Sequence, residues 1–334
     1  MRTTTTMTAW LNDRYGPAGD TRQAEVPTPQ PGAGEVLVRV RATALNAADV
    51  HLMHGDPLLM RLMFGLHRPK QPIRGNDVAG TVVAAGPGVK GLGVDAARVG
   101  EEVVVELDGG GLAPFAVARA DRLVARPAGL APEAAATLPI SGGTAVQALD
   151  AAGVVACSRV LVLGASGGVG TFTVQLAALR GAEVWATCGE ANRALVESLG
   201  AKRTFDYRTT DVPGIPASFD AIIDIAGSLP LRRPRRLLTP TGVIAMVGGE
   251  GGHVLGPIPR MLRGMFLSIG SRRSIRMVMA VAKPEINEQL VALAAEGRIT
   301  PVIEQVLPWD AAGEGLARLE SGRTVGKVVV LGRE

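Results

Sequence analysis

A glycine-rich turn carries the clearest chemical signal in this sequence. Gly164, Gly167 and Gly170 follow the hydrophobic run RVLVL. The stretch VGTFTVQLAALRG, which begins at Val169, carries apolar residues at helical spacing. Glycines at these spacings let a phosphate group approach the backbone without meeting a Cβ, and a helix N-terminus offers unpaired N–H groups. The turn is therefore predicted to bind the pyrophosphate of a dinucleotide. The predicted donors are the backbone amides of Ser166, Gly167, Gly168 and Val169.

The end of the next hydrophobic run, EVWAT, bears on the choice between NADPH and NADH. A protein that binds NAD usually carries an acidic residue there for the ribose hydroxyls, whereas this chain has Thr187 and Cys188. Without that carboxylate a 2′-phosphate is not repelled, and nearby polar and cationic side chains can bind it. These side chains are Asn192, Arg193, Tyr207 and Arg208. NADPH is the predicted cofactor, and NADH stays open because Glu190 follows closely.

Two hydrophobicity patterns divide the chain into two domains. Residues 35–43, 78–84 and 102–107 alternate apolar and polar side chains, as in short antiparallel strands. From Arg159 onward, buried apolar runs alternate with helical stretches, as in a parallel sheet with crossover helices. The closing run KVVVL is predicted to pair with the N-terminal β region. The expected fold is α/β, with a Rossmann domain at 128–270 set inside a mostly β domain formed by 1–127 and 271–334.

Composition excludes several classes of protein. The formal net charge is only +4, which argues against a dedicated nucleic-acid binder, and an arginine cluster between Ser228 and Arg276 is interpreted as a solvated surface. No apolar run is long enough for a signal peptide or a membrane span, so no membrane partner is expected. Cys157 and Cys188 are the only cysteines, which indicates a reducing, cytoplasmic location; both are expected to be buried and inert.

Several motifs together resemble the medium-chain dehydrogenase/reductase superfamily, most closely its zinc-free quinone oxidoreductase-like branch. The motifs are ALNAADVHLMHG (44–55), RGNDVAGTVVAAGPGV (74–89), the turn GASGGVG, FDAIIDIAGS (219–228) and SGRTVGKVVV near the C-terminus. The resemblance implies a GroES-like, mostly β catalytic domain plus a Rossmann-type doubly wound parallel sheet domain. It also implies a homodimer.

The same resemblance argues against a catalytic zinc. Relatives that use zinc carry Cys where this chain has Asn46, and Gly-His-Glu where it has Gly-Asn-Asp at 75–77. The four close cysteines of a structural zinc lobe are missing from residues 86–115. Tetrahedral zinc needs thiolate, imidazole or carboxylate donors. Asp49, His51 and Asp77 remain as ligand alternatives without a cysteine among them, and no metal is predicted.

Site residues follow from the resemblance. Asn46 is expected beside the nicotinamide as a hydrogen-bond donor to the substrate oxygen, with Asp49 orienting it. His51 replaces a Tyr of many relatives, and it is either a proton donor or a structural histidine. The remaining cofactor contacts implied are Thr144, Gly189, Gly248 and, for the phosphates, Lys327.

The predicted reaction is hydride transfer from NADPH to a quinone or an α,β-unsaturated carbonyl compound. A conjugated acceptor needs only orientation and a hydrogen-bond donor, whereas oxidation of a simple alcohol needs a base or a Lewis acid. Three alternatives stay open: a dedicated enoyl reductase of a biosynthetic pathway, an NADPH-binding sensor or structural relative with little turnover, and a nucleic-acid binder that uses the arginine cluster.

Overall fold

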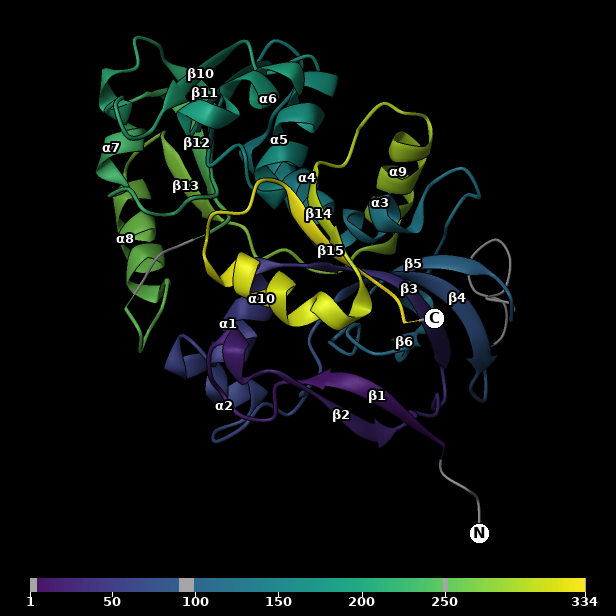
Figure 1. Ribbon diagram of the computed structural model, residues 1–334. Helices are drawn as coiled ribbons and strands as arrows, with labels where there is room; N and C mark the ends of the chain where they lie inside the picture. Colours follow the sequence, from purple (N-terminus) through teal and green to yellow (C-terminus); the bar gives the residue numbers. More distant parts are fainter. Residues whose placement is uncertain (1–4, 90–98, 249–251, 334) are drawn as a thin grey trace. The chain divides into compact units, whose positions relative to one another are not determined.

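The computed structural model describes residues 5–89, 99–248 and 252–333, and the chain folds into two compact units. Unit 1 comprises Met1–Ile140 and Ala282–Glu334, and unit 2 comprises Ser141–Val281. Unit 2 is thus inserted into unit 1, the arrangement expected from the sequence (Figure 1). Both boundaries lie about a dozen residues after the expected positions, 127/128 and 270/271.

Unit 1 is built on a seven-stranded sheet with the order β14-β15-β3-β4-β5-β7, in which β6 also pairs with β3. Its strands are β3 (Glu35–Leu45), β4 (Asp77–Ala85), β5 (Glu102–Glu106), β6 (Phe115–Arg119), β7 (Val124–Ala125), β14 (Ile303–Leu307) and β15 (Lys327–Leu331). A separate antiparallel pair joins β1 (Thr6–Leu11) to β2 (Arg22–Pro27). Along β3, exposed Arg39 and Arg41 alternate with buried Val38 and Val40, which is the periodicity of a sheet buried on one face.

The C-terminal segment completes this sheet. Strand β15 lies antiparallel to β3, with Val328 opposite Leu45, and this confirms the predicted pairing with the N-terminal β region. Helices α1 (Ala47–His54) and α10 (Ala312–Glu320) contribute Met53 and Leu316 to a buried cluster with Val328. The other helices of unit 1 are α2 (Arg61–Phe64), α3 (Pro132–Ala136) and α9 (Pro284–Ala295).

Unit 2 is a six-stranded, fully parallel sheet with the order β10-β9-β8-β11-β12-β13. The strands are β8 (Arg159–Leu163), β9 (Glu183–Cys188), β10 (Arg203–Asp206), β11 (Phe219–Asp224), β12 (Leu238–Met246) and β13 (Ser274–Met277). The helices are α4 (Gly143–Ala152), α5 (Gly168–Leu179), α6 (Arg193–Ser198), α7 (Arg232–Arg235) and α8 (Ile258–Ser268). This strand order is that of the doubly wound dinucleotide-binding fold.

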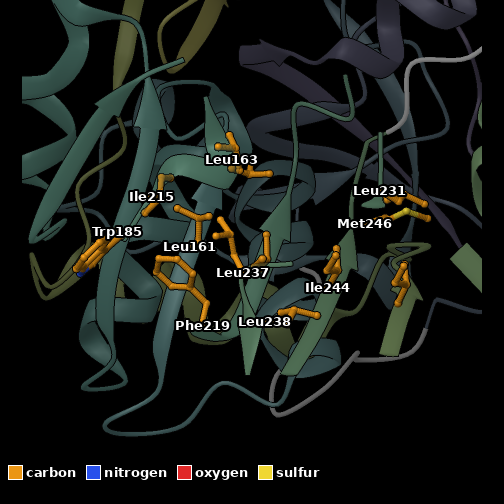
Figure 2. Close-up of a cluster of buried hydrophobic side chains, with 13 residues drawn as sticks. Leu161, Leu163, Trp185, Ile215, Phe219, Leu231, Leu237, Leu238, Ile244 and Met246 are labelled. Atoms are coloured by element: carbon orange, nitrogen blue, oxygen red, sulfur yellow. The ribbon is translucent and has the colours of Figure 1, made fainter. Parts of the chain in front are cut away.

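A buried cluster holds the sheet of unit 2 together, and Figure 2 shows its side chains along the strands. Trp185 packs edge-on against Phe219, with ring centroids 5.5 Å apart. Leu231 and Met246 belong to the same cluster (Figure 2). Complete burial of one such side chain contributes about 1.5 to 3 kcal/mol to stability, so burial of the apolar runs stabilises this sheet.

The two cysteines differ in exposure. Cys188 is buried at the end of β9, and burial raises the pKa of its thiol to about 11. Cys157 is exposed, so the expectation that both are buried is wrong for this residue. It lies in the short turn between α4 and β8 and has a positive φ of 64°, which is uncommon for a residue other than glycine. Of the helices in the described ranges, none has the length and apolar character needed to cross a membrane.

Candidate functional site

The glycine turn between β8 and α5 has the geometry of a phosphate cradle. Gly164 has a positive φ of 89°, which favours glycine. A Cβ on Gly170 would lie 2.2 Å from the carbonyl oxygen of Gly164, so this glycine allows helix and strand to pack closely. A Cβ on Gly167, by contrast, would have no protein atom nearer than 3.8 Å. The space next to Gly167 is therefore open to a ligand.

The first turn of α5 supplies the donors for that space. Gly167 is the N-cap of the helix, and no side chain of a described residue caps it. Residues 166–169 are partly exposed, whereas Ala165 and Gly170 on either side are buried. Free N–H groups and the positive end of the helix dipole favour an anion at this position. The residues present therefore fit a dinucleotide pyrophosphate.

The end of β9 contains Thr187 and Cys188, both buried, with no carboxylate at either position. Thr187 binds the glycine turn, because its hydroxyl accepts a hydrogen bond from Gly164 N–H at 3.3 Å and its carbonyl accepts one from Ala165 N–H at 3.0 Å. The residue that usually selects NAD is thus replaced by one that fixes the turn.

The cationic residues beyond β9 have different partners. Arg193 donates from Nη1 to Glu190, at 3.2 Å, and from Nε to the Thr204 hydroxyl, at 2.9 Å. Its charge is therefore largely balanced. Arg208 lies over the ring of Tyr207, 5.0 Å from the centroid, and its Nη1 would be 3.3 Å from a Cβ on Gly189. Arg208, rather than Arg193, is the better placed cation beside Gly189.

The remaining predicted cofactor contacts also lie in unit 2. Asn192 ends the short helical turn that precedes α6. Thr144 is buried in the first turn of α4. Gly248 follows β12, and a Cβ on it would lie 2.3 Å from the carbonyl oxygen of Ile225, so only glycine fits there. Tyr207 is 57% exposed at the end of β10.

In unit 1 two of the three predicted catalytic residues, Asn46 and Asp49, belong to a buried polar cluster at the start of α1. Asn46 caps this helix, and the Asp49 carboxylate accepts hydrogen bonds from Asn46 N–H at 2.8 Å and Gly75 N–H at 2.9 Å. Burial raises the pKa of Asp49, while these two backbone hydrogen bonds oppose the rise. Asp49 therefore fixes the backbone at Asn46 through this hydrogen bond.

The Asn46 amide is occupied within the protein. Its Nδ2 donates to the Ala44 carbonyl at 3.2 Å and to the Asp77 carboxylate at 3.0 Å, and its Oδ1 accepts from Lys327 Nζ. Both N–H donors are in use, so the expected donation from Asn46 to a substrate oxygen would first require one of these bonds to break.

Lys327, which was expected to contact the cofactor phosphates, is buried and bound within unit 1, and its contact with the phosphates stays a prediction. Its side chain is 2% exposed, with Nζ on Asn46 and 3.9 Å from the Asp77 carboxylate. Asp77 also accepts from Ile140 N–H at 3.2 Å. Burial raises the pKa of Asp77 and lowers that of Lys327, and their mutual attraction opposes both shifts. The three residues form one unit, the Asn46–Asp77–Lys327 cluster.

His51 lies outside this cluster. It is exposed on α1, and its Nδ1 lies 3.2 Å from the Asp56 carbonyl oxygen. A hydrogen bond to that carbonyl requires the proton on Nδ1 and fixes the tautomer. Both readings of His51, proton donor and structural residue, are compatible with this position.

Within residues 5–89, 99–248 and 252–333, no three His, Cys, Asp or Glu side chains are close enough together to hold a metal ion.

Two family descriptions match the chain. Residues 32–128 match the alcohol dehydrogenase GroES-like domain, and residues 199–330 match the zinc-binding dehydrogenase domain. The sequence is 33% identical over 340 residues to a chloroplast envelope quinone oxidoreductase homologue of Arabidopsis thaliana, with 96% of each chain covered. It is 34% identical to the chloroplastic quinone-oxidoreductase QR1 of Triphysaria versicolor, covering 97% of this chain and 98% of the relative. It is 30% identical to a 2-methylene-furan-3-one reductase of Solanum lycopersicum, covering 97% and 79%.

Solved structures show the same two-domain architecture. A quinone oxidoreductase from Coxiella burnetii superposes with a TM-score of 0.86 at 25% identity, covering 98% of this chain and 100% of that one. An NAD-dependent alcohol dehydrogenase gives 0.80 at 30% identity, with 97% and 99% covered. A mycobacterial protein complexed with NADPH gives 0.80 at 26% identity, with 97% and 99% covered.

Proposed function

Since this chain belongs to the medium-chain dehydrogenase/reductase superfamily, in its quinone oxidoreductase-like branch, and is an oxidoreductase, we propose that it reduces quinones or α,β-unsaturated carbonyl compounds with NADPH and without zinc. The observation that carries the proposal is the open space at Gly167 beside the uncapped start of α5. The chemistry that NADPH supplies when bound is a hydride from its nicotinamide ring.

The residues of unit 2 have separate tasks in this proposal. The backbone amides of residues 166–169 hold the pyrophosphate, and Gly248 keeps the turn after β12 free of side chain. Thr144, Gly189 and Asn192 are proposed as further contacts. Tyr207 and Arg208 provide an aromatic surface and a guanidinium for the adenosine end, including a 2′-phosphate.

Conjugated acceptors are proposed because of what unit 1 provides. A simple alcohol must develop alkoxide character before it loses hydride, and a metal ion usually contributes several kcal/mol to that step. Position 46 holds an asparagine amide bound to Asp77 and Lys327 in place of a metal ligand. A quinone or an enone spreads the incoming charge over its own framework, so one hydrogen-bond donor is enough. His51 is the exposed candidate for that donor.

The proposed activity is tested with purified protein, NADPH and a panel of ortho-quinones and small enals. Oxidation of ethanol with NAD(P)⁺ is measured as the control for alcohol dehydrogenase activity. We expect NADPH oxidation with a conjugated acceptor, unchanged rates in the presence of a chelator, and less than stoichiometric zinc by elemental analysis. One zinc per chain, or brisk ethanol oxidation without reduction of any conjugated acceptor, would contradict the proposal.

Cofactor preference is tested at Arg208. Arg208→Gln is expected to raise the Kd of NADPH about 10-fold and to leave that of NADH nearly unchanged, because only NADPH offers a phosphate for a charge-assisted hydrogen bond. Arg193→Gln is the matched variant, and a smaller effect is expected because Glu190 already binds Arg193. Equal losses for both cofactors in Arg208→Gln would show that this arginine does not read the phosphate.

A second candidate is a reductase dedicated to one enone substrate. It is favoured by the similarity to the tomato enzyme, whose named substrate contains a methylene group conjugated to a ketone. A low-turnover NADPH-binding sensor is the third candidate. The acceptor panel separates the three, because they differ in breadth and rate of turnover.

The setting of the enzyme is also proposed. We propose a cytoplasmic protein without a nucleic-acid or membrane partner. We also propose a homodimer, supported by β13, which ends the described sheet of unit 2 and leaves one edge for pairing with a second copy. Sedimentation of the purified protein tests the dimer.

A further inference from the structure

A pocket of about 400 Å³ lies within unit 2, and none of its lining residues belongs to the glycine turn. Its lining combines three arginines with apolar side chains from the segment after β11 and from α8. The lining residues are Pro230, Leu231, Arg232, Arg260, Arg263, Phe266 and Leu267. Pockets that bind small organic molecules have this volume and a similar mixture of apolar walls and a few polar groups.

Arg260 is fixed and electrically balanced. Its guanidinium donates to the Leu229 carbonyl and to the Asp224 carboxylate, which is buried at the end of β11. Burial raises the pKa of Asp224, and Arg260 opposes that rise. This pair therefore forms a rigid part of the wall that adds little net charge.

Arg232 and Arg263 carry the net positive charge of the pocket. Both are exposed, and neither forms an ion pair or a hydrogen bond with a carboxylate in the part of the chain that the structure describes. Neighbouring Arg233, by contrast, lies 3.3 Å from Asp211. Two guanidinium groups without a carboxylate partner among the described residues favour an anion beside the pocket, and their planar donor geometry suits a carboxylate.

The apolar part of the pocket is incompletely covered. Phe266 is 71% exposed, although it lies on a helix that packs against the core through Met261 and Leu267. Gly264 brings α8 close to the sheet, since a Cβ there would be 3.1 Å from Ile275. An apolar ligand chain against Phe266 would remove phenyl surface from water, at about 25 cal/mol per Å².

We propose that this pocket binds an amphiphilic organic carboxylate, with the carboxylate against Arg232 and Arg263 and the alkyl chain along Leu231 and Phe266. The site goes beyond the proposed reductase function and shares no residue with the dinucleotide cradle. Its occupancy is measurable by equilibrium binding, so the outcome does not depend on which acceptor the enzyme reduces.

The test is isothermal titration calorimetry with octanoate, 1-octanol and acetate, carried out on the full chain with saturating NADP⁺. Octanoate is expected to bind once per chain, and the alcohol and acetate at least about 10-fold more weakly, because each lacks one of the two contacts. Arg232→Gln/Arg263→Gln is expected to weaken octanoate at least about 10-fold. Phe266→Ala should also weaken it.

Two matched variants control for general effects. Arg236→Gln removes an exposed arginine of the same segment, and Met265→Ala removes an exposed apolar side chain of α8; neither residue lines the pocket. Both should bind octanoate like the parent. Unaltered octanoate binding in the double arginine variant, equal binding of 1-octanol, or no octanoate binding to the parent chain with saturating NADP⁺ would each overturn the proposal. The thermal midpoint of the double variant establishes that it is folded.

Discussion

Replacing Lys327 with methionine is expected to lower the free energy of unfolding by about 3 to 5 kcal/mol. The ammonium group binds Asn46 and lies 3.9 Å from Asp77, and all three side chains are buried. Methionine has a similar length but no charge. The Asp77 carboxylate would therefore lose the cation of the Asn46–Asp77–Lys327 cluster. Denaturant unfolding monitored by circular dichroism measures the change.

The loss should grow as the pH rises. Burial raises the pKa of Asp77 in the folded state, so the folded variant is favoured where Asp77 is protonated and loses stability as the pH rises through that pKa. Lys70→Met, at an exposed position, should change stability by less than about 0.5 kcal/mol. Lys327→Met/Asp77→Asn should recover part of the loss. A pH-independent loss that the second substitution does not reduce would show that packing, and not charge, is responsible.

Substitutions in the glycine turn are expected to give the second large effect: one glycine is needed for NADPH binding and the other for stability. Gly167→Ala is expected to raise the Kd of NADPH about 10- to 100-fold with little change in stability, since its Cβ would occupy ligand space and meet no protein atom within 3.8 Å. Gly170→Ala is expected to cost about 1 to 3 kcal/mol of stability or more, because its Cβ would lie 2.2 Å from the Gly164 oxygen.

Thermal unfolding without cofactor and a fluorescence titration with NADPH separate the two effects. Gly129→Ala is a suitable control, because its Cβ would meet nothing within 4 Å. Normal NADPH binding by Gly167→Ala would exclude the turn as the phosphate site. If Gly170→Ala were as stable as the parent, β8 and α5 would be able to move apart at this point without a loss of folding free energy.

Much of the fold could be predicted because long buried strands leave a strong pattern. Strands β3, β8 and β12 and the helix after the glycine turn all lie where the apolar periodicity placed them. Strands β10 and β13 were missed. Each has four residues, RTFD and SIRM, and each lies at an edge of its sheet, where one apolar face is enough and arginine is tolerated.

The candidate site was predictable only where the signal is local. The cradle from Gly164 to Gly170 lies within one turn, so spacing alone identifies it. Lys327 and Asn46 are 281 positions apart and meet only because β15 pairs with β3. Asp77 had been weighed only as a metal ligand, and nothing in its neighbourhood in sequence indicates a buried ion pair with Lys327. Arg208 was one of four candidates for binding the 2′-phosphate. It became the preferred cation only because the structure pairs Arg193 with Glu190.

The insertion of unit 2 also determines the order in which the strands of unit 1 can pair while the chain is being synthesised. Strand β3 can receive β4 and β6 early, but its partner β15 emerges only after the whole of unit 2. At about 5 to 20 residues per second, the roughly 190 residues between Ile140 and the end of β15 take about 10 to 40 s to synthesise. During that time the edge of β3 that pairs with β15 has no partner strand. Asn46 and Asp77 also lack their contact with Lys327, which is part of β15. Unit 1 therefore completes its sheet only at the end of synthesis, whereas unit 2 can fold as soon as its own strands have emerged.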